Sequence, residues 1–475
     1  MVTHENPATG RDPGSRAAVD LRVSQNTYVS AADPAVPAVI TVRGAAGHPS
    51  AASAVVLLMD CSASMDWPPS KIAAARQAAV AAIDAVRDDV LFALVQGTES
   101  ASMAYPAEAR LVPATPEHRS AAKSAARRLA AAGGTAMGTW LALARKLFAN
   151  HPDHIKHAIL LTDGHNQSEA GWVLRAELAK CAGLFTCDAR GIGDDWDPLV
   201  LRETTTALRG RADAVVAEAD LAADFRRVID AATGKVLARL RLRITTMPYA
   251  TVRALWQKSP DDVDMTGDLQ RPTTRTAEVD TGAWGAETRE FLLSLDLDPA
   301  GLSAAEEVQV GRVELLASDG EVVAGPVAVL ARLTADEVLS SRLDPKVQSY
   351  LVRDELGAAM TAGWNAHGRD DTAEAQRHWG EAVRLATELG DAEALHRLRR
   401  LVEVDDARTG RVRLRPDVRP RDAFSVLLGA TITGADPPPA AQPAATGPNI
   451  TCGTCQRISP AGTTACPQCG TRFDQ

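Results

Sequence analysis

The chain has 475 residues, of which 45% are apolar and 23% charged, a balance typical of a globular protein with several cores. Its formal net charge of −9 gives no overall positive field that would attract nucleic acid, which makes that partner unlikely. The N-terminus has no apolar signal segment, and no later run approaches the ~20 apolar residues of a membrane span. We therefore expect a cytoplasmic protein with no membrane contact.

The first part of the chain predicts a tail followed by strands. Residues 1–16 are polar with Pro and Gly, which is typical of a disordered tail. Between residues 20 and 43, apolar and polar residues alternate around a Pro-containing turn, which predicts two antiparallel strands. Two strands alone are not stable. Because the same alternation returns later, we predict one β-sandwich made of residues 17–46 and 236–335.

Residues 52–232 lie between these two segments and predict an α/β domain inserted into the sandwich. Continuous apolar runs indicate strands buried on both faces of a mainly parallel sheet. The helices between them should cross over with a right hand, giving a doubly wound, Rossmann-like sheet with its ligand site at the carboxyl ends of the strands. The predicted strands are 54–60, 90–97, 157–163, 185–193 and 212–219, and the predicted helices include 70–87, 117–131, 138–149, 169–181 and 221–233.

The last third of the chain predicts a small helical domain at 336–410, a linker at 411–448 and a module at 449–475. The helical domain has a period typical of helices, and its Trp, Ala and Gly spacings resemble one and a half tetratricopeptide repeats. The linker is rich in Pro and Ala and lacks the apolar residues of a core. The predicted helices are 346–366, 370–389 and 391–403.

A cluster of oxygen-bearing side chains is expected at one edge of the α/β sheet. Two predicted strands end in Asp60 and Asp163, so both carboxylates should lie at the same edge. Ser62 and Ser64 follow the first aspartate, and Thr135 comes from a glycine-rich loop. Such oxygens suit a hard cation such as Mg²⁺ or Mn²⁺. An open position on that ion would attract an external Asp or Glu. For either aspartate alone, the alternative is a helix cap.

These residues resemble the motif of the von Willebrand factor A (VWA) domain. DCSASM at 60–65, GGT at 133–135 and LLTDG at 160–164 match its metal-ion-dependent adhesion site in residue type, order and spacing. The resemblance covers residues 52–232. It implies that Ser62 and Ser64 ligate the ion directly, with Thr135 as a further ligand and the two aspartates acting directly or through water.

A second motif lies at the C-terminus. Two CxxC pairs separated by ten residues are typical of a Cys₄ Zn²⁺ site, and the segment resembles a zinc ribbon. With four protein ligands the ion would be structural, and its binding would fold the module. Disulfides or free thiols are the alternative. The cysteines are Cys452, Cys455, Cys466 and Cys469; the remaining three, Cys61, Cys181 and Cys187, are expected to be small buried side chains.

Several weaker features receive structural interpretations. The histidines His151, His154 and His157 straddle a loop and a strand, so we expect surface residues and no shared metal. The aspartates Asp194, Asp195 and Asp197 follow a predicted strand and border the site, but Asp197-Pro198 favours a helix N-cap. His165 and Asn166 are expected at the rim of the binding face. The stretch from Arg397 to Arg421 includes acidic residues and predicts a solvated surface, with phosphate binding as the alternative.

We therefore predict a non-enzymatic cytosolic scaffold or adaptor, whose metal site recognises an acidic residue of a partner protein. The architecture is similar to that of bacterial intracellular VWA proteins associated with tellurite resistance and kinase–phosphatase signalling. That similarity implies a Ser/Thr kinase, a phosphatase or an AAA+ ATPase as partner, in signalling or stress response. The alternative is a nucleic-acid-associated protein that uses the ribbon and the Arg-rich stretch. A metal-dependent hydrolase fits least, because the sequence has no Ser-His-Asp order and no P-loop.

Overall fold

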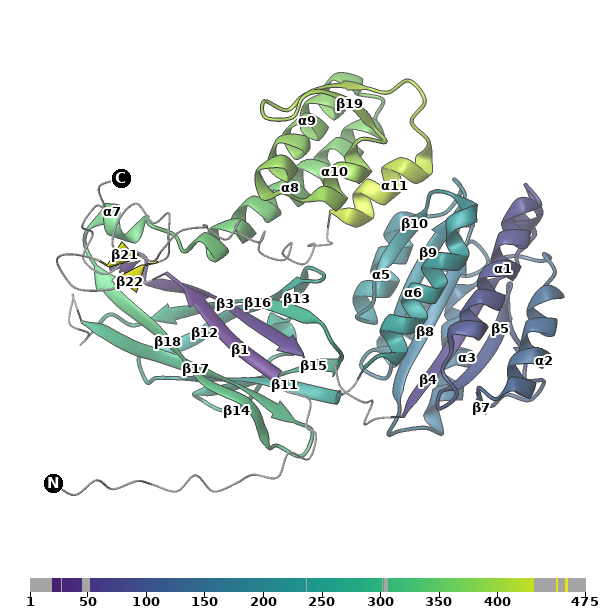
Figure 1. Cartoon of the computed structure of the whole chain (residues 1–475), viewed down its shortest axis with the longest axis horizontal. Coiled ribbons are helices and arrows are strands. Elements are labelled where there is room, and N and C mark those ends of the chain that lie inside the picture. The colour runs from purple at the N-terminus through teal and green to yellow at the C-terminus, as the bar shows by residue number, and fades with distance from the viewer. Residues whose placement is uncertain are drawn as a thin grey trace. The chain divides into compact units, whose positions relative to one another are not determined.

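The computed structural model describes residues 19–26, 28–44, 52–235, 237–300, 302, 306–430, 450–451 and 458–459. The chain divides into two compact units, Met1–Thr433 and Gly434–Gln475. The first unit contains an α/β domain, a two-sheet region and a helical region (Figure 1). None of the described helices is long and apolar enough to cross a membrane.

The α/β domain is built on a seven-stranded sheet in which five strands run parallel, and the predicted Rossmann-like class is confirmed. Its strand order is β10-β9-β8-β4-β5-β6, with β7 also paired to β5. All eight residues of β4 are buried, which explains their unbroken apolar run. The antiparallel edge strands β6 and β7 were not predicted. The strands are β4 Ser53–Asp60, β5 Leu91–Gly97, β6 Ala101–Tyr105, β7 Val112–Pro113, β8 Ile155–Thr162, β9 Thr186–Ile192 and β10 Ala212–Val215.

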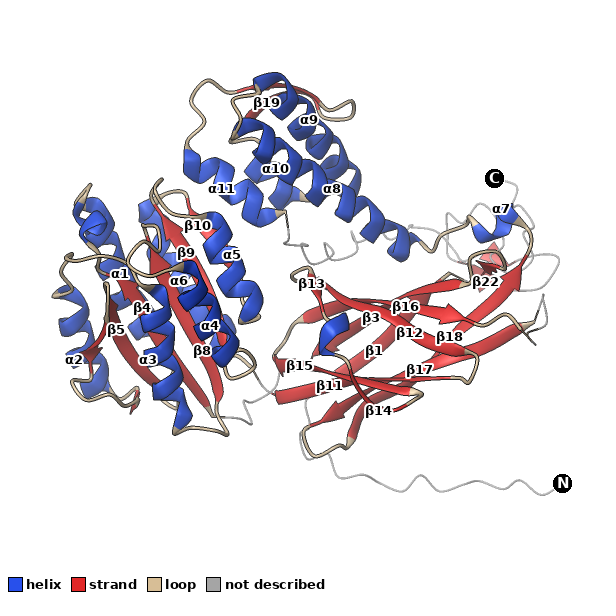
Figure 2. Ribbon diagram, turned by 180° about the vertical axis from the view of Figure 1, so that it is seen from behind, coloured by secondary structure: helices blue, strands red, loops and turns tan. Residues whose placement is uncertain are grey.

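Helices cover both faces of this sheet, as Figure 2 shows. One buried cluster joins the sheet to α1, α2 and α6, and a second joins its other face to α3, α4 and α5. The predicted helix 117–131 ends earlier, at Arg127, and the predicted strand 212–219 ends at Val215. The elements are α1 Ser70–Ala85, α2 Pro116–Arg127, α3 Met137–Ala149, α4 Gly171–Cys181, α5 Pro198–Ala207 and α6 Leu221–Thr233, with the short 3₁₀ helices η1 Ala63–Asp66 and η2 Glu218–Asp220.

Strands β1–β3 and β11–β18 of the first unit form two further sheets that share one apolar core. Their orders are β1-β3-β16-β12-β13 and β14-β15-β11-β17-β18-β2. The strands are β1 Val19–Gln25, β2 Tyr28–Ser30, β3 Ala35–Gly44, β11 Leu237–Thr246, β12 Ala250–Ser259, β13 Val263–Asp264, β14 Gln270–Thr273, β15 Thr276–Trp284, β16 Thr288–Leu297, β17 Glu307–Ala317 and β18 Val322–Thr334, with 3₁₀ helix η3 Thr266–Asp268.

Strands from before and after the α/β domain pair with one another. β1 and β3 are antiparallel, as the sequence predicted for residues 20–43, with Val19 opposite Gly44. On its other side β3 pairs antiparallel with β16, where Ile40 lies opposite Phe291. The short strand β2 pairs parallel with β18. The segment before the α/β domain therefore supplies interior positions of the shared core.

The two ends of the α/β domain approach the same backbone position. A Cβ built on Gly44, the last residue of β3, would lie 2.2 Å from the carbonyl oxygen of Gly285. A Cβ built on Gly285 would lie 2.9 Å from the carbonyl oxygen of Gly234, which follows α6. The chain therefore leaves the two-sheet region and returns to it beside one glycine, where side chains would not fit.

The helical region extends further along the chain than predicted. Residues 411–448 were predicted to be a linker, but residues 411–414 form a strand and residues 420–429 form a helix with a buried apolar face. A Pro at the first helical position fits that helix start, so a segment rich in Pro is here a packed element. The elements are α7 Glu337–Ser340, α8 Pro345–His367, α9 Thr372–Leu389, α10 Ala392–Leu398, β19 Val402–Asp406, β20 Arg411–Leu414 and α11 Pro420–Gly429.

The second unit contains one described strand pair, β21 Ile450–Thr451 with β22 Ile458–Ser459, which is antiparallel. The four cysteines of the predicted zinc module lie outside the described residues.

Candidate functional site

The ends of two neighbouring strands bring Asp60 and Asp163 to one edge of the α/β sheet. β4 ends at Asp60, β8 ends at Thr162, and the two strands are paired in parallel with Met59 opposite Leu161. Both carboxylates are 0% exposed. Because parallel strands end at a common edge, the two aspartates lie where the sequence predicted.

The turn after β4 links the two aspartates through hydroxyl groups. Ser62 donates its backbone N–H to Asp60 Oδ1 at 2.8 Å, and its hydroxyl lies 2.9 Å from that of Ser64. Ser64 in turn donates its hydroxyl to Asp163 Oδ1 at 2.7 Å. The 3₁₀ helix η1 begins directly after Ser62 and fixes this turn. Four of the five predicted ligands are therefore connected by hydrogen bonds.

The fifth predicted ligand, Thr135, comes from the loop before α3 and is 1% exposed. This loop is held against the first one, because Ala63 donates its N–H to the carbonyl of Gly133 at 3.0 Å. A Cβ built on Gly164 would lie 3.3 Å from Ser64 Oγ and 3.5 Å from Thr135 Oγ1. Both hydroxyls therefore face the same point, and the glycine after Asp163 leaves that point free of a side chain.

Two residues that the sequence analysis missed complete the cluster. Thr162 donates its hydroxyl to Asp60 Oδ2 at 2.6 Å. Lys71, in the first turn of α1, forms a hydrogen bond and ion pair from its Nζ to Asp163 Oδ2. Its side chain is 8% exposed. A positively charged lysine is unfavourable near the N-terminus of a helix because of the helix dipole. This was the feature of the sequence that could have pointed to Lys71.

Burial sets the electrostatics of Asp60. Removal from solvent raises the pKa of Asp60 to about 6, against the lowering effect of hydrogen bonds from Thr162 and Ser62. A carboxylate that is costly to hold charged in a buried place gains from a cation beside it. Burial alone therefore favours the neutral form of this carboxyl group.

The donor set fits a hard cation. The five side chains offer three hydroxyl and two carboxyl groups, and oxygen ligands are what Mg²⁺ and Mn²⁺ prefer. Among the described residues, no group of three or more His, Cys, Asp or Glu side chains is placed to hold a metal. A cation at this edge would therefore depend on the hydroxyls of Ser62, Ser64 and Thr135.

The loop after β9 borders the cluster and is fixed in several ways. Asp197 caps α5 by accepting the backbone N–H of Leu199 at 2.8 Å, so its predicted N-cap role is confirmed. Asp195 lies 3.7 Å from His165, which is exposed beside the site. Asp194 pairs with the Arg421 side chain at 2.6 Å and accepts the backbone N–H of Arg421, in the first turn of α11, at 3.2 Å. Asn166 accepts the N–H of Met137 at 2.8 Å and so holds the start of α3.

Two other sequence predictions are corrected. His157 is not an exposed surface residue: its side chain is 12% exposed, and its Nε2 lies 2.9 Å from Oδ2 of the half-buried Asp188. The Arg397–Arg421 stretch is not simply a solvated surface, because both arginines that bound it pair with the α/β domain. Arg397 bonds Asp213 on β10, and Arg421 bonds Asp194. Cys61, Cys181 and Cys187 are free and buried, as expected.

Helix α11 contacts the same bordering loop. The ring of Phe424 packs edge-on against Trp196, with 4.8 Å between ring centroids. Trp196 is 1% exposed and donates its indole N–H to the carbonyl of Gly193 at 3.0 Å. The helical region thus packs against the loop whose Gly193 lies beside Lys71.

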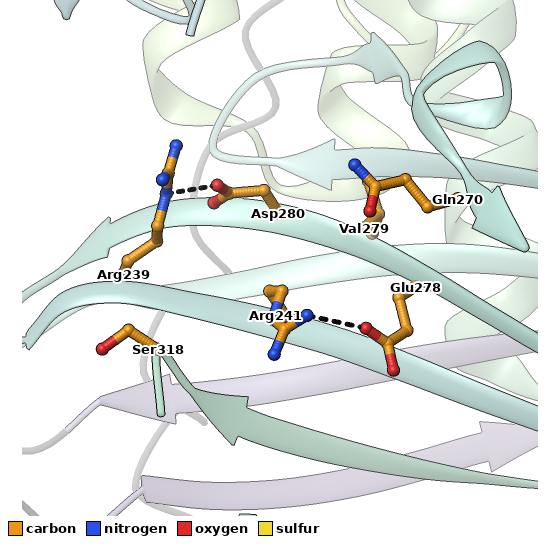
Figure 3. Close-up of a pocket in the computed structure, with 7 residues that line it drawn as sticks. All are labelled: Arg239, Arg241, Gln270, Glu278, Val279, Asp280 and Ser318. Carbon is orange, nitrogen blue, oxygen red and sulfur yellow. Dashed lines mark hydrogen bonds and ion pairs between the residues drawn. The ribbon is translucent and has the colours of Figure 1, made fainter. Parts of the chain in front are cut away.

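A pocket of about 370 Å³ lies on the sheet that contains β11 and β15 (Figure 3). Its arginines are already paired with carboxylates: Arg239 lies 2.5 Å from Asp280, and Arg241 lies 2.9 Å from Glu278. Since these pairs satisfy the charges that line it, the pocket is a weaker candidate than the edge of the α/β sheet.

Comparison with known proteins identifies relatives for most of the chain. The model of the von Willebrand factor type A domain matches residues 53–214, and that of the von Willebrand factor type A C-terminal domain matches residues 384–426. A solved structure described as von Willebrand factor type A from Catenulispora acidiphila is 36% identical, covers 90% of this chain and 99% of its own, and has a TM-score of 0.81. The ArnB paralog VWA2 from Sulfolobus acidocaldarius shares the fold at 12% identity, with a TM-score of 0.53 and coverage of 88% of this chain and 100% of its own. A comparison with curated proteins gave no match.

Proposed function

Since the chain belongs to the von Willebrand factor type A family, whose domains commonly mediate protein–protein interaction, we propose that it is a metal-dependent adaptor. One observation carries the proposal: five oxygen-bearing side chains, four of them buried and that of Ser64 half-buried, converge from three loops at the carboxyl edge of the sheet. They are Asp60, Ser62, Ser64, Thr135 and Asp163. These residues would hold Mg²⁺ or Mn²⁺.

The five residues would contribute two kinds of ligand to a bound cation. Ser62, Ser64 and Thr135 offer neutral oxygens, which leave a bound ion electron-poor, while Asp60 and Asp163 supply the charge. When bound, the ion would supply a Lewis-acidic position for the carboxylate of an Asp or Glu on a partner. Gly164 keeps the approach to Ser64 and Thr135 free of a side chain.

Exposed aromatic rings flank this edge of the sheet. Trp67 is 81% exposed and follows η1, and Trp172 is 68% exposed at the start of α4. Each therefore lies on the segment that follows β4 or β8, the two strands whose ends place the aspartates. Exposed tryptophans favour protein contact, because large rings dominate the binding energy of many interfaces. We infer that they contact apolar side chains next to the partner's carboxylate.

A binding role is favoured over a catalytic one. Both oxygens of Asp163 are engaged, by Ser64 and by Lys71, and both oxygens of Asp60 accept hydrogen bonds. Neither carboxylate is therefore placed as a free general base. We also regard nucleic-acid binding through the Arg-rich stretch as less favoured, since Arg397 and Arg421 are occupied by Asp213 and Asp194.

The rest of the predicted architecture supports an adaptor. The pairing of β3 with β16 and of β2 with β18 supports the inference that the VWA domain is inserted into a β-sandwich. The helical region and a C-terminal zinc ribbon would add contacts to a cytosolic signalling partner such as a kinase, a phosphatase or an AAA+ ATPase. A Cys466→Ser protein that retained a full equivalent of zinc would rule out the ribbon.

Metal titration of the full chain tests the central proposal. We expect the wild-type protein to bind Mn²⁺, and Asp60→Ala and Ser64→Ala to lose that binding. Ser124→Ala is a matched control, because its hydroxyl lies on the surface of α2 and only bonds its own helix. Dialysis against metal-free buffer, rather than a strong chelator, spares zinc in the cysteine module.

Cross-linking in the native cell supplies the second readout. Loss of a desolvated charge contact costs on the order of 2–5 kcal/mol, so the affinity of Asp60→Ala for its partner should fall about thirtyfold or more. If Asp60→Ala binds Mn²⁺ and captures the same partners as the wild type, the metal edge is not the functional surface.

A further inference from the structure

Lys71 places an ammonium group inside the candidate metal site. Its ammonium bonds Asp163 Oδ2, while the other oxygen of the same carboxylate accepts the hydroxyl of Ser64. The lysine side chain is 8% exposed and the aspartate side chain 0%. The ion pair is therefore largely shielded from solvent and cannot be regarded as a surface contact.

The surroundings are shaped to hold this lysine. Its backbone N–H bonds the carbonyl of Pro68 at 3.0 Å, which fixes the first turn of α1. A Cβ built on Gly193 would lie 3.2 Å from the lysine Cδ and 3.7 Å from Nζ. Gly193 also has a φ of +82°, a conformation that favours glycine. Because Gly193, directly after β9, has no side chain, the aliphatic part of the lysine side chain can pass beside it to reach Asp163.

The lysine changes the charge of the site. Two carboxylates and one ammonium leave a single negative charge, so a divalent cation would give a site with one net positive charge. Without Lys71 the two carboxylates would neutralise the cation completely. The same ammonium therefore weakens the attraction for a metal and strengthens the attraction of the loaded site for an anion.

We propose that Lys71 is a built-in counter-charge that keeps metal binding weak until a carboxylate ligand completes the site. The inference rests on the proposed function and adds to it a rule for assembly: cation and carboxylate bind cooperatively. By linkage, a carboxylate that tightens cation binding must itself be tightened by the cation to the same extent.

Titration of the full chain with Mn²⁺, followed through the paramagnetic resonance signal of the free ion, tests this charge effect. Lys71→Met and Lys71→Gln should bind Mn²⁺ at least tenfold more tightly than the wild type. Lys123→Met is the matched control, since Lys123 also pairs with a carboxylate, Asp84, but on the surface between two helices; its Mn²⁺ affinity should equal that of the wild type. Asp60→Ala defines the background of binding elsewhere.

The sign of the result separates this role from a merely structural one. Damage to the site would weaken Mn²⁺ binding, whereas removal of a counter-charge must strengthen it. Lys71→Gln keeps a hydrogen-bond donor for Asp163 and covers the case in which Lys71→Met does not fold. Equal or weaker binding in the folded variant overturns the inference. Absence of Mn²⁺ binding in the wild type would instead overturn the proposed function.

Acetate, the smallest carboxylate probe, tests the cooperativity. Saturating acetate should raise the Mn²⁺ affinity of the wild type by a larger factor than that of Lys71→Gln. An equal factor in both proteins would contradict the cooperative part of the inference.

Discussion

Arg397 of α10 and Asp213 of β10 form a bidentate ion pair, with 2.8 Å from Nη1 to Oδ1 and 2.9 Å from Nη2 to Oδ2. The same guanidinium donates to the carbonyl and the hydroxyl of Ser425 in α11, both at 2.9 Å. Burial disfavours its charge, but Asp213 and Glu393 keep the pKa of Arg397 above its usual value. One side chain thus joins α10 and α11 to the edge strand of the VWA sheet.

We predict that Arg397→Met destabilises the attachment of these helices. Loss of one partner of a buried ion pair costs about 3–5 kcal/mol, and exposure of the Asp213 side chain, 34%, reduces this. We expect a loss of about 2 kcal/mol, measured from denaturant midpoints. Arg413→Met, which removes a pair on an exposed hairpin, should change stability far less. If the stability losses of Arg397→Met and Asp213→Asn simply add in the double variant, the two side chains are not coupled.

Gly191→Ala should disturb both the VWA domain and the helix that packs on it. A Cβ at Gly191 would lie 2.2 Å from Cε2 of Trp196, whose ring contacts Phe424 of α11. Overpacking of this kind costs about 1–3 kcal/mol, which a lowered melting temperature and a changed near-ultraviolet dichroism of tryptophan would reveal. Gly267→Ala is the control, because nothing lies within 4 Å of a Cβ there. Equal melting temperatures for both variants would count against this packing.

The internal thiols should resist alkylation in the native protein. Burial raises the pKa of Cys61 and of Cys181 to about 12, so the reactive thiolate is scarce at neutral pH. At pH 8 an ordinary thiol of pKa about 8.5 is roughly one quarter ionised, and these two should react at least a thousandfold more slowly. Between pH 8 and pH 10 their thiolate fraction should keep rising, whereas that of an ordinary thiol levels off.

Peptide mass spectrometry after iodoacetamide treatment would give both rates. Labelling in guanidinium provides the reference for the unfolded chain. Rapid native labelling of Cys61 would mean that the turn after β4 opens readily, which would contradict a tightly held cluster.

Deletion of residues 1–46 should cause aggregation or a large fall in melting temperature. The deletion removes β1, β2 and β3, which bares the edges of β16 and β18 and exposes core positions. Val36, Ile40 and Val42 of β3 are 0% exposed. The bared neighbouring strand edges would invite pairing with other chains. Deletion of residues 1–16 alone, where the sequence predicts a tail, should be harmless. A soluble protein with a normal melt after the longer deletion would show that these strands are dispensable.

The sequence was most informative where local pattern and topology agree. A strand buried on both faces must be apolar throughout, so the ends of β4 and β8 could be located and the convergence of Asp60 with Asp163 inferred from parallel pairing alone. The occupancy of the cluster by a metal stays a prediction, as does the zinc module, whose cysteines lie outside the described residues.

Interactions that depend on tertiary contact could not be inferred from the sequence. Lysine side chains usually lie in solvent, and only the fold brings the ammonium group of Lys71 to Asp163. Helix α11 begins in a segment rich in Pro and Arg. Its apolar face becomes buried only through contact with Trp196 and β10. Composition predicted a linker there because it records which residues are present and carries no information on what they pack against.

The close approach of Gly44, Gly234 and Gly285 has a mechanical consequence. A partner bound at the carboxyl edge of the VWA sheet would pull on a domain that is joined to the two-sheet region by two backbone crossings rather than one. Tension would divide between the crossing that follows β3 and the crossing that precedes β11. A single hinge allows a tethered domain to swivel freely, whereas a pair of adjacent tethers resists twisting and transmits torque to the strands on either side.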